Sequence, residues 1–111
     1  EKSLRLNQGI DGHLVSGHVD GVGKVQSINK DGDSTRIKIL VEIDLIKYIA
    51  KKGSICINGV SLTVNSVEGN IFDVNIVPHT FSVTTLGDLS IESNVNLEID
   101  LIARYVENLI S

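Results

Sequence analysis

The side chains of this sequence that could do chemistry are three histidines, one cysteine and a series of hydroxyl and amide groups. His13 and His18 are five residues apart in a strand-like segment, so we expect them to point to opposite faces, and His79 lies far away along the chain. No pair of histidine or cysteine residues has the spacing of a zinc site. Cys56 lies between two isoleucines, a setting typical of a buried small residue rather than an activated thiol. The sequence therefore predicts neither a metal site nor a cysteine nucleophile.

Polar side chains recur along the faces of the predicted strands. They are Ser61, Thr63, Asn75, Asn96, Glu98 and Asp100. Such residues are ordinary on a solvated barrel exterior, but under a second domain they would form a hydrogen-bonding wall for a polyhydroxylated, heteroaromatic ligand. The short Gly21-Val22-Gly23 sequence is not a phosphate loop, because no helix follows it and no Lys-Ser/Thr pair completes a nucleotide pattern.

The elements that must position these groups are mainly strands, since valine and isoleucine make up 28 of the 111 residues and alanine only 2. Strands are predicted at residues 13–19, 22–28, 36–43, 60–64, 72–76 and 95–100, most of them from alternation with period two. Turn signals lie at 30–33, 58–59 and 68–70. Six short strands with such spacing predict a small closed barrel in one domain.

Two segments have helical spacing instead. The stretch from Asp44 to Gly53 begins with an N-cap residue, ends with two lysines and a glycine, and predicts a helix near 44–52. A second helix is predicted near 101–110, with Asp100 as its N-cap. Its apolar stripe needs a partner surface, which is either another subunit or the barrel itself.

Charge and composition exclude several classes of protein. Ten basic and 14 acidic residues give a formal charge of −4, with no Lys/Arg cluster beyond a pair, so no nucleic-acid partner is predicted. A single cysteine excludes an internal disulfide, and no apolar stretch reaches the length of a membrane span or a secretory signal. We therefore expect a cytoplasmic location with no membrane partner.

Five ordered motifs carry a family resemblance. They are GHLVSGHVDGVG at 12–23, INGVSLTV at 57–64, VPHTF at 77–81, TTLG at 84–87 and NLEID at 96–100. In order and spacing they closely resemble the second of the two lumazine-binding repeats of the riboflavin synthase family. The resemblance implies a six-stranded antiparallel Greek-key barrel at residues 9–111, with 1–8 as a linker or remnant of a preceding repeat.

The resemblance also implies an activity. Enzymes of that family convert two molecules of 6,7-dimethyl-8-ribityllumazine into riboflavin and a pyrimidinedione by moving a four-carbon unit, without a metal or organic cofactor. They assemble as homotrimers, and each site lies between the first barrel of one subunit and the second barrel of its neighbour. Because the C7 methyl group of the substrate is acidic, the protein mainly has to stack two substrates in a defined pose. A chain resembling one repeat is expected to bind ligand with little turnover.

Site residues follow from the matching positions. The resemblance implies catalytic roles for His18, Lys52, Ser61 and Asp100. It implies substrate contacts for Gly17, His18, Val19, Lys52, Ser61, Leu62, Thr63, Asn75, Ile76, Val77, Pro78, His79 and Thr80, and also matches Asn58. Some of these residues have structural alternatives: a histidine in the barrel seam, a helix C-terminal lysine, a turn asparagine and a helix N-cap.

Two other functions are compatible with the sequence. The same fold resemblance extends to non-catalytic lumazine and flavin carrier proteins of luminous bacteria. A purely structural domain would use the terminal helix near 101–110 as a subunit contact. The intact site motifs favour the enzyme-derived interpretation over a carrier protein. Substitution of Ser61 and Thr63 separates the structural domain from the binding functions, since loss of ligand without loss of fold supports binding.

Overall fold

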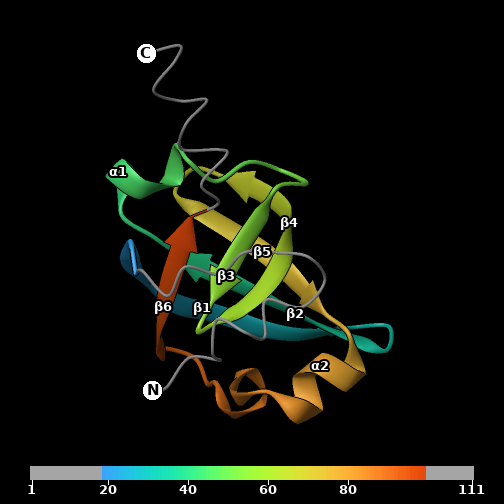
Figure 1. Cartoon of the computed structure of the whole chain (residues 1–111). Helices are drawn as coiled ribbons and strands as arrows, with labels where there is room; N and C mark the ends of the chain where they lie inside the picture. Colours follow the sequence, from blue (N-terminus) through green and yellow to red (C-terminus); the bar gives the residue numbers. More distant parts are fainter. Residues whose placement is uncertain (1–18, 100–111) are drawn as a thin grey trace.

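The computed structural model describes residues 19–99, which form a closed barrel of six antiparallel strands (Figure 1). They are β1 (Gly21–Asp31), β2 (Ser34–Leu40), β3 (Ser54–Ile57), β4 (Val60–Glu68), β5 (Ile71–Ile76) and β6 (Asn94–Ile99). The order around the barrel is β1-β2-β5-β4-β3-β6. Since β3, β4 and β5 follow one another and β6 returns to lie beside β3, the topology is a Greek key. The predicted fold is confirmed.

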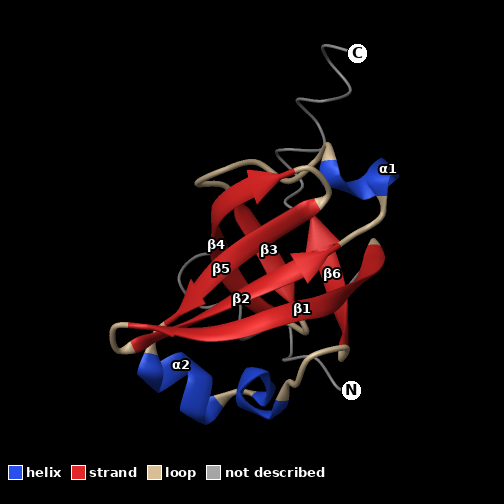
Figure 2. Ribbon diagram, turned by 180° about the vertical axis from the view of Figure 1, so that it is seen from behind, coloured by secondary structure: helices blue, strands red, loops and turns tan. Residues whose placement is uncertain are grey.

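Two connections cover opposite ends of the barrel (Figure 2). The link from β2 to β3 contains α1 (Ile43–Ile46), and the link from β5 to β6 contains α2 (Pro78–Val83) and the 3₁₀ helix η3 (Thr85–Asp88). Leu86 of η3 is fully buried and closes the core at that end. No helix within residues 19–99 has the length and apolar character needed to cross a membrane.

The core is aliphatic because alternate strand residues point inward. Its fully buried side chains are Val25, Ile37, Ile39, Ile55, Ile57, Val64, Phe72, Val74, Ile76, Leu86, Val95 and Leu97. Gly23 of β1 shows how closely the strands approach, since a Cβ atom there would lie 2.6 Å from Ile39 Cγ2. Glycine at this position therefore allows β1 to lie close to the neighbouring strands.

Strand β3 was not predicted from the sequence. Its residues Ile55, Cys56 and Ile57 are all buried, so the segment shows no alternation between apolar and polar side chains. The predicted strand at 13–19 lies outside the described residues except for Val19, which precedes β1 and is not in a strand. In the structure the sixth strand of the barrel is therefore β3, at residues 54–57, and not the segment predicted at 13–19.

The helix predicted near 44–52 is shorter than expected. It occupies a single turn, and its N-cap is Glu42 rather than Asp44. The chain then continues in turns: the Tyr48 N–H donates to the Leu45 carbonyl and the Ile49 N–H donates to the Ile46 carbonyl. Burial of Ile49 pulls the chain onto the barrel end before a second turn of helix can form. The helix predicted near 101–110 lies outside the described residues.

Candidate functional site

Polar side chains on the outer face of the barrel form a row across neighbouring strands. Ser54 of β3 pairs with Thr63 of β4, and Asn75 of β5 pairs with Arg36 of β2. The pairing of Val64 with Val74 brings Thr63 opposite Asn75. Because Val64 and Val74 point into the core, the alternating neighbours Thr63 and Asn75 point outward. The strand register thus brings hydroxyl and amide groups together from distant parts of the sequence.

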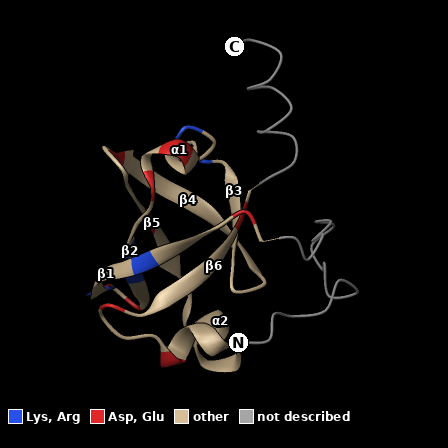
Figure 3. Cartoon of the chain, turned by 90° about the vertical axis from the view of Figure 1, so that its left-hand side faces the viewer, with Lys and Arg blue, Asp and Glu red and all other residues tan. Residues whose placement is uncertain are grey.

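Apart from Arg36, the residues of this row line a groove of about 750 Å³. The groove is lined by Lys51, Lys52, Ser54, Ser61, Leu62, Thr63, Val64, Asn65, Asn75, Val77 and Thr80. Two lysines and no acidic residue are among these lining residues, although the whole chain carries a formal charge of −4. Basic residues lie in the chain that follows α1, at the end of the barrel that α1 covers (Figure 3). The groove therefore combines hydrogen-bonding groups, a basic end and a short apolar stretch.

The basic end is held by the backbone. Lys52 has a φ of 71°, in the left-handed region that is unfavourable for a residue with a long side chain. Its N–H donates to the Val64 carbonyl at 2.8 Å, and the Val64 N–H donates to the Gly53 carbonyl at 2.8 Å. These bonds fix the lysine backbone against β4, so the strain is maintained at the edge of the groove.

The other end is formed by the chain that leaves β5. Val77 is about half exposed and is the N-cap residue of α2, with Pro78 in the first turn, where a missing N–H costs nothing. The Thr84 hydroxyl donates to the Thr80 carbonyl at 2.7 Å and also accepts from the Leu86 N–H. These contacts fix the short helix, and with it Thr80, at the end of the groove.

The groove gathers seven of the substrate-contact residues that the sequence predicted. They are Lys52, Ser61, Leu62, Thr63, Asn75, Val77 and Thr80. Ile76 points into the core, while Pro78 and His79 are exposed in α2 and do not line the groove. Val19 is exposed and is not among the lining residues either. Gly17, His18 and Asp100 lie outside the described residues.

Four lining residues were missed from the sequence: Lys51, Ser54, Val64 and Asn65. Ser54 was missed together with strand β3. Asn65 continues the alternation of Ser61 and Thr63, a signal that was present in the sequence. Lys51 is adjacent to the predicted Lys52, but nothing in the pattern separates it from a solvated lysine.

Asn58 lies in the β3–β4 turn and not in the groove. It is buried, has a φ of 49° and is followed by Gly59 with a φ of 85°. Its N–H donates to the Asn96 carbonyl at 2.8 Å, and its side-chain oxygen accepts from the Asn96 N–H at 2.7 Å. Asn58 thus ties the turn to β6, which is a structural role.

Cys56 is buried but lies on the same strand face as Ser61 and Glu98, its partners in the neighbouring strands. Burial, and next the Glu98 carboxylate, raise the pKa of the Cys56 thiol to about 11. The thiol is therefore protonated near neutral pH and is a poor nucleophile.

Residues 19–99 contain no cluster of three histidine, cysteine or acidic side chains suited to a metal ion.

Comparison with known proteins places this groove in context. The family model described as lumazine binding domain matches residues 16–100. The chain is 46% identical over 110 residues to riboflavin synthase of Photobacterium leiognathi, covering 99% of this chain and 50% of that protein. It is 43% identical over 109 residues to riboflavin synthase of Brucella abortus (strain 2308), covering 98% of this chain and 54% of that protein. The chain spans about half the length of these relatives.

Solved structures show the same barrel. A crystal structure of LumP complexed with 6,7-dimethyl-8-(1'-D-ribityl) lumazine matches with a TM-score of 0.74 and 32% identity, over 81% of this chain and 50% of that one. LumP complexed with riboflavin matches with a TM-score of 0.73 and 33% identity, over 79% of this chain and 47% of that one. LumP complexed with flavin mononucleotide matches with a TM-score of 0.73 and 32% identity, over 81% of this chain and 50% of that one.

Proposed function

This chain belongs to the lumazine-binding domain family, and from that premise we propose that its groove binds 6,7-dimethyl-8-ribityllumazine and riboflavin. We further propose that it serves as one of the two repeats of a riboflavin synthase, with residues 9–111 as the binding domain and 1–8 as a linker or remnant of the other repeat. The observation that carries the proposal is the groove itself, where residues 61–64 of one motif meet Val77 and Thr80 of another on the outside of the barrel.

The lining residues suit the parts of such a ligand. Hydroxyls of Ser61, Thr63 and Thr80 can donate to and accept from the ribityl chain, and the Asn75 amide can read the donors and acceptors of the ring. Leu62 and Val77 supply apolar contact for the flat ring. The two lysines at the basic end also favour ligands with a phosphate on the ribityl chain, such as flavin mononucleotide.

In the whole enzyme we propose that this repeat holds one of two stacked lumazines while the other repeat of a neighbouring subunit holds the second. A four-carbon unit then passes from one lumazine to the other, giving riboflavin and leaving a pyrimidinedione. The protein contributes mainly orientation, because the acidic C7 methyl group needs no strongly tuned base. We propose that the whole protein is a cytoplasmic, homotrimeric transferase in which His18 and Asp100 are further site residues.

The proposal is tested by fluorescence titration of the chain with the lumazine and with riboflavin, followed by an assay for riboflavin formation. We expect saturable binding of both ligands with little turnover. A Ser61→Ala, Thr63→Val double variant should keep the fold and lose affinity. Absence of binding by the folded wild-type chain would contradict the proposed function. Turnover near the rate of a complete enzyme would contradict its assignment as one repeat of a pair.

A further inference from the structure

Strand β4 contains an irregularity beside the groove. Its register with β5 shifts between Val64, which pairs with Val74, and Ser66, which pairs with Asp73. Val64 is buried, and the next residue of β4 packed against the core is Val67. The two residues between them therefore both lie on the outer side, where a regular strand would place one.

The two outward residues do different things. Asn65 lines the groove, in line with Thr63 on the same strand. The Ser66 hydroxyl turns instead to β5, where it donates to Asp73 Oδ1 at 3.0 Å. Bulges commonly re-aim a side chain next to a binding site. Here the bulge separates a ligand-facing residue from one that anchors the strand.

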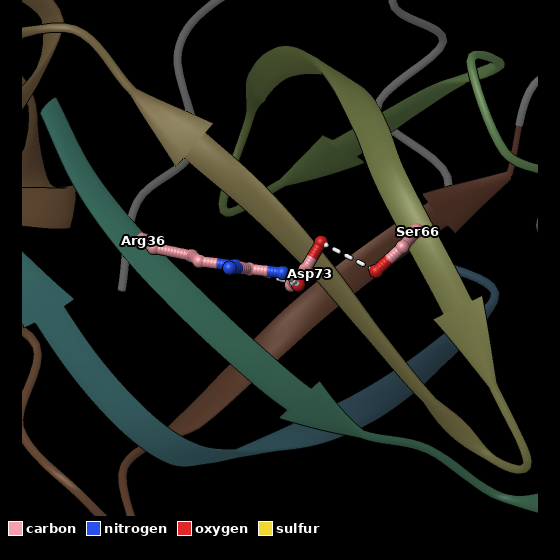
Figure 4. Close-up of polar contacts among 3 residues, drawn as sticks. All are labelled: Arg36, Ser66 and Asp73. Atoms are coloured by element: carbon pink, nitrogen blue, oxygen red, sulfur yellow. Dashed lines mark hydrogen bonds and ion pairs between the residues drawn. The ribbon is translucent and has the colours of Figure 1, made fainter. Parts of the chain in front are cut away.

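The anchor is a buried carboxylate held from both sides. The Asp73 side chain is only 3% exposed, and its Oδ2 accepts from Arg36 Nε at 2.8 Å and lies 2.7 Å from Arg36 Nη2. Figure 4 shows Arg36 reaching Asp73 from β2 while Ser66 reaches it from β4. One carboxylate thus joins three neighbouring strands just beyond the row of Thr63 and Asn75.

A buried ion pair is weak evidence for stability, because the loss of hydration offsets much of the attraction. Its geometry points to another role here. Asp73 lies two residues from the groove residue Asn75 on the same face of β5, and its partner Ser66 follows the groove residue Asn65. A displacement of this carboxylate would therefore move groove residues of both β4 and β5.

We propose that Asp73 is a positioning residue of the groove: held by Arg36 and Ser66, its carboxylate fixes the β4 bulge so that Thr63 and Asn65 face the same space as Asn75. The proposal rests on the proposed function for the identity of the ligand. It assigns Asp73, Arg36 and Ser66 no direct contact with that ligand.

The first test uses Ser66→Ala, which removes the hydroxyl and leaves the Arg36–Asp73 pair in place. We expect the dissociation constant for 6,7-dimethyl-8-ribityllumazine to rise about fivefold. This is the change expected when the net contribution of one hydrogen bond is lost. Ser66→Thr keeps the hydroxyl and should restore affinity. Glu92→Gln is the matched control, because it breaks the exposed Lys24–Glu92 pair, whose residues do not line the groove. Wild-type affinity in Ser66→Ala would overturn the proposal, even if its melting temperature falls.

A second readout needs no ligand. In two-dimensional NMR spectra, the side-chain amide signal of Asn75 should move in Ser66→Ala, return in Ser66→Thr and stay unchanged in Glu92→Gln. An unmoved Asn75 signal in Ser66→Ala would overturn the proposal whether or not the wild-type chain binds lumazine. A wild-type chain that fails to bind while Asn75 responds as expected would overturn the proposed function and leave the positioning role supported.

Discussion

Asn58 provides a sharp test of the boundary between structural and ligand-contacting residues. The sequence motif suggested a site residue, whereas the structure places its side chain against the backbone of Asn96. In Asn58→Ala, loss of the 2.7 Å bond leaves the Asn96 N–H without its partner, at a cost of about 1–3 kcal/mol. The φ of 49° adds about 1 kcal/mol, because alanine tolerates the left-handed region less well than asparagine.

We therefore expect Asn58→Ala to lower the free energy of unfolding by about 2–4 kcal/mol, and the melting temperature by about 8–16 °C. Asn58→Gly separates the two causes, because glycine accepts the positive φ but also lacks the side-chain oxygen. It should lose only the hydrogen-bond part, about 1–3 kcal/mol. Thermal and urea unfolding measure both values.

Ligand affinity distinguishes a structural role of Asn58 from a ligand-contacting one. Since Asn58 does not line the groove, each variant should bind the lumazine as the wild type does, at a temperature where the variant is fully folded. An Asn58 variant with wild-type stability and strongly reduced affinity would refute this reasoning and return the residue to the binding site.

Three further predictions follow from the groove and its surroundings. Thr63→Val removes one hydroxyl from an exposed side chain, so lumazine affinity should fall about fivefold with an unchanged melting temperature; equal affinity in a titration would contradict its role. Lys52→Gly relieves the backbone strain at a φ of 71°, so calorimetry should show an equal or higher melting temperature while ligand affinity falls. A fall in both the melting temperature and the affinity would argue against strain at this position. The stability of the wild type should decline as the pH rises from 9.0 towards about 11, because the Cys56 thiol then ionises in the unfolded chain but stays protonated in the folded one. Urea unfolding of Cys56→Ala should lack that part of the decline, and an identical pH profile would contradict the raised pKa.

The strands that could be predicted are those whose side chains alternate between core and solvent. In β2 the buried Ile37 and Ile39 are separated by the exposed Lys38, so the period is visible in the sequence. Strand β3 could not be found this way, because Ile55, Cys56 and Ile57 are all buried. The helix after β2 was overestimated because a local pattern cannot show that burial of Ile49 ends it.

The site divides in the same manner. Ser61, Thr63 and Thr80 could be identified because they belong to motifs that the family resemblance makes recognisable. The contact between Arg36 and Asp73 could not be predicted, because it joins residues 37 positions apart through the pairing of β2 with β5. The side chains of Asn65 and Ser66 both point outward because of a bulge, and no residue type in β4 predicts that bulge.

The most direct test of the central claim is an NMR titration of the isotopically labelled chain with 6,7-dimethyl-8-ribityllumazine. The account predicts saturable shifts concentrated in the groove, at Ser61, Thr63, Asn65, Asn75 and Thr80, with little change in the turn at Asn58. Shifts gathered on another face of the barrel, or none at saturating lumazine, would contradict the assignment of this groove as the ligand site.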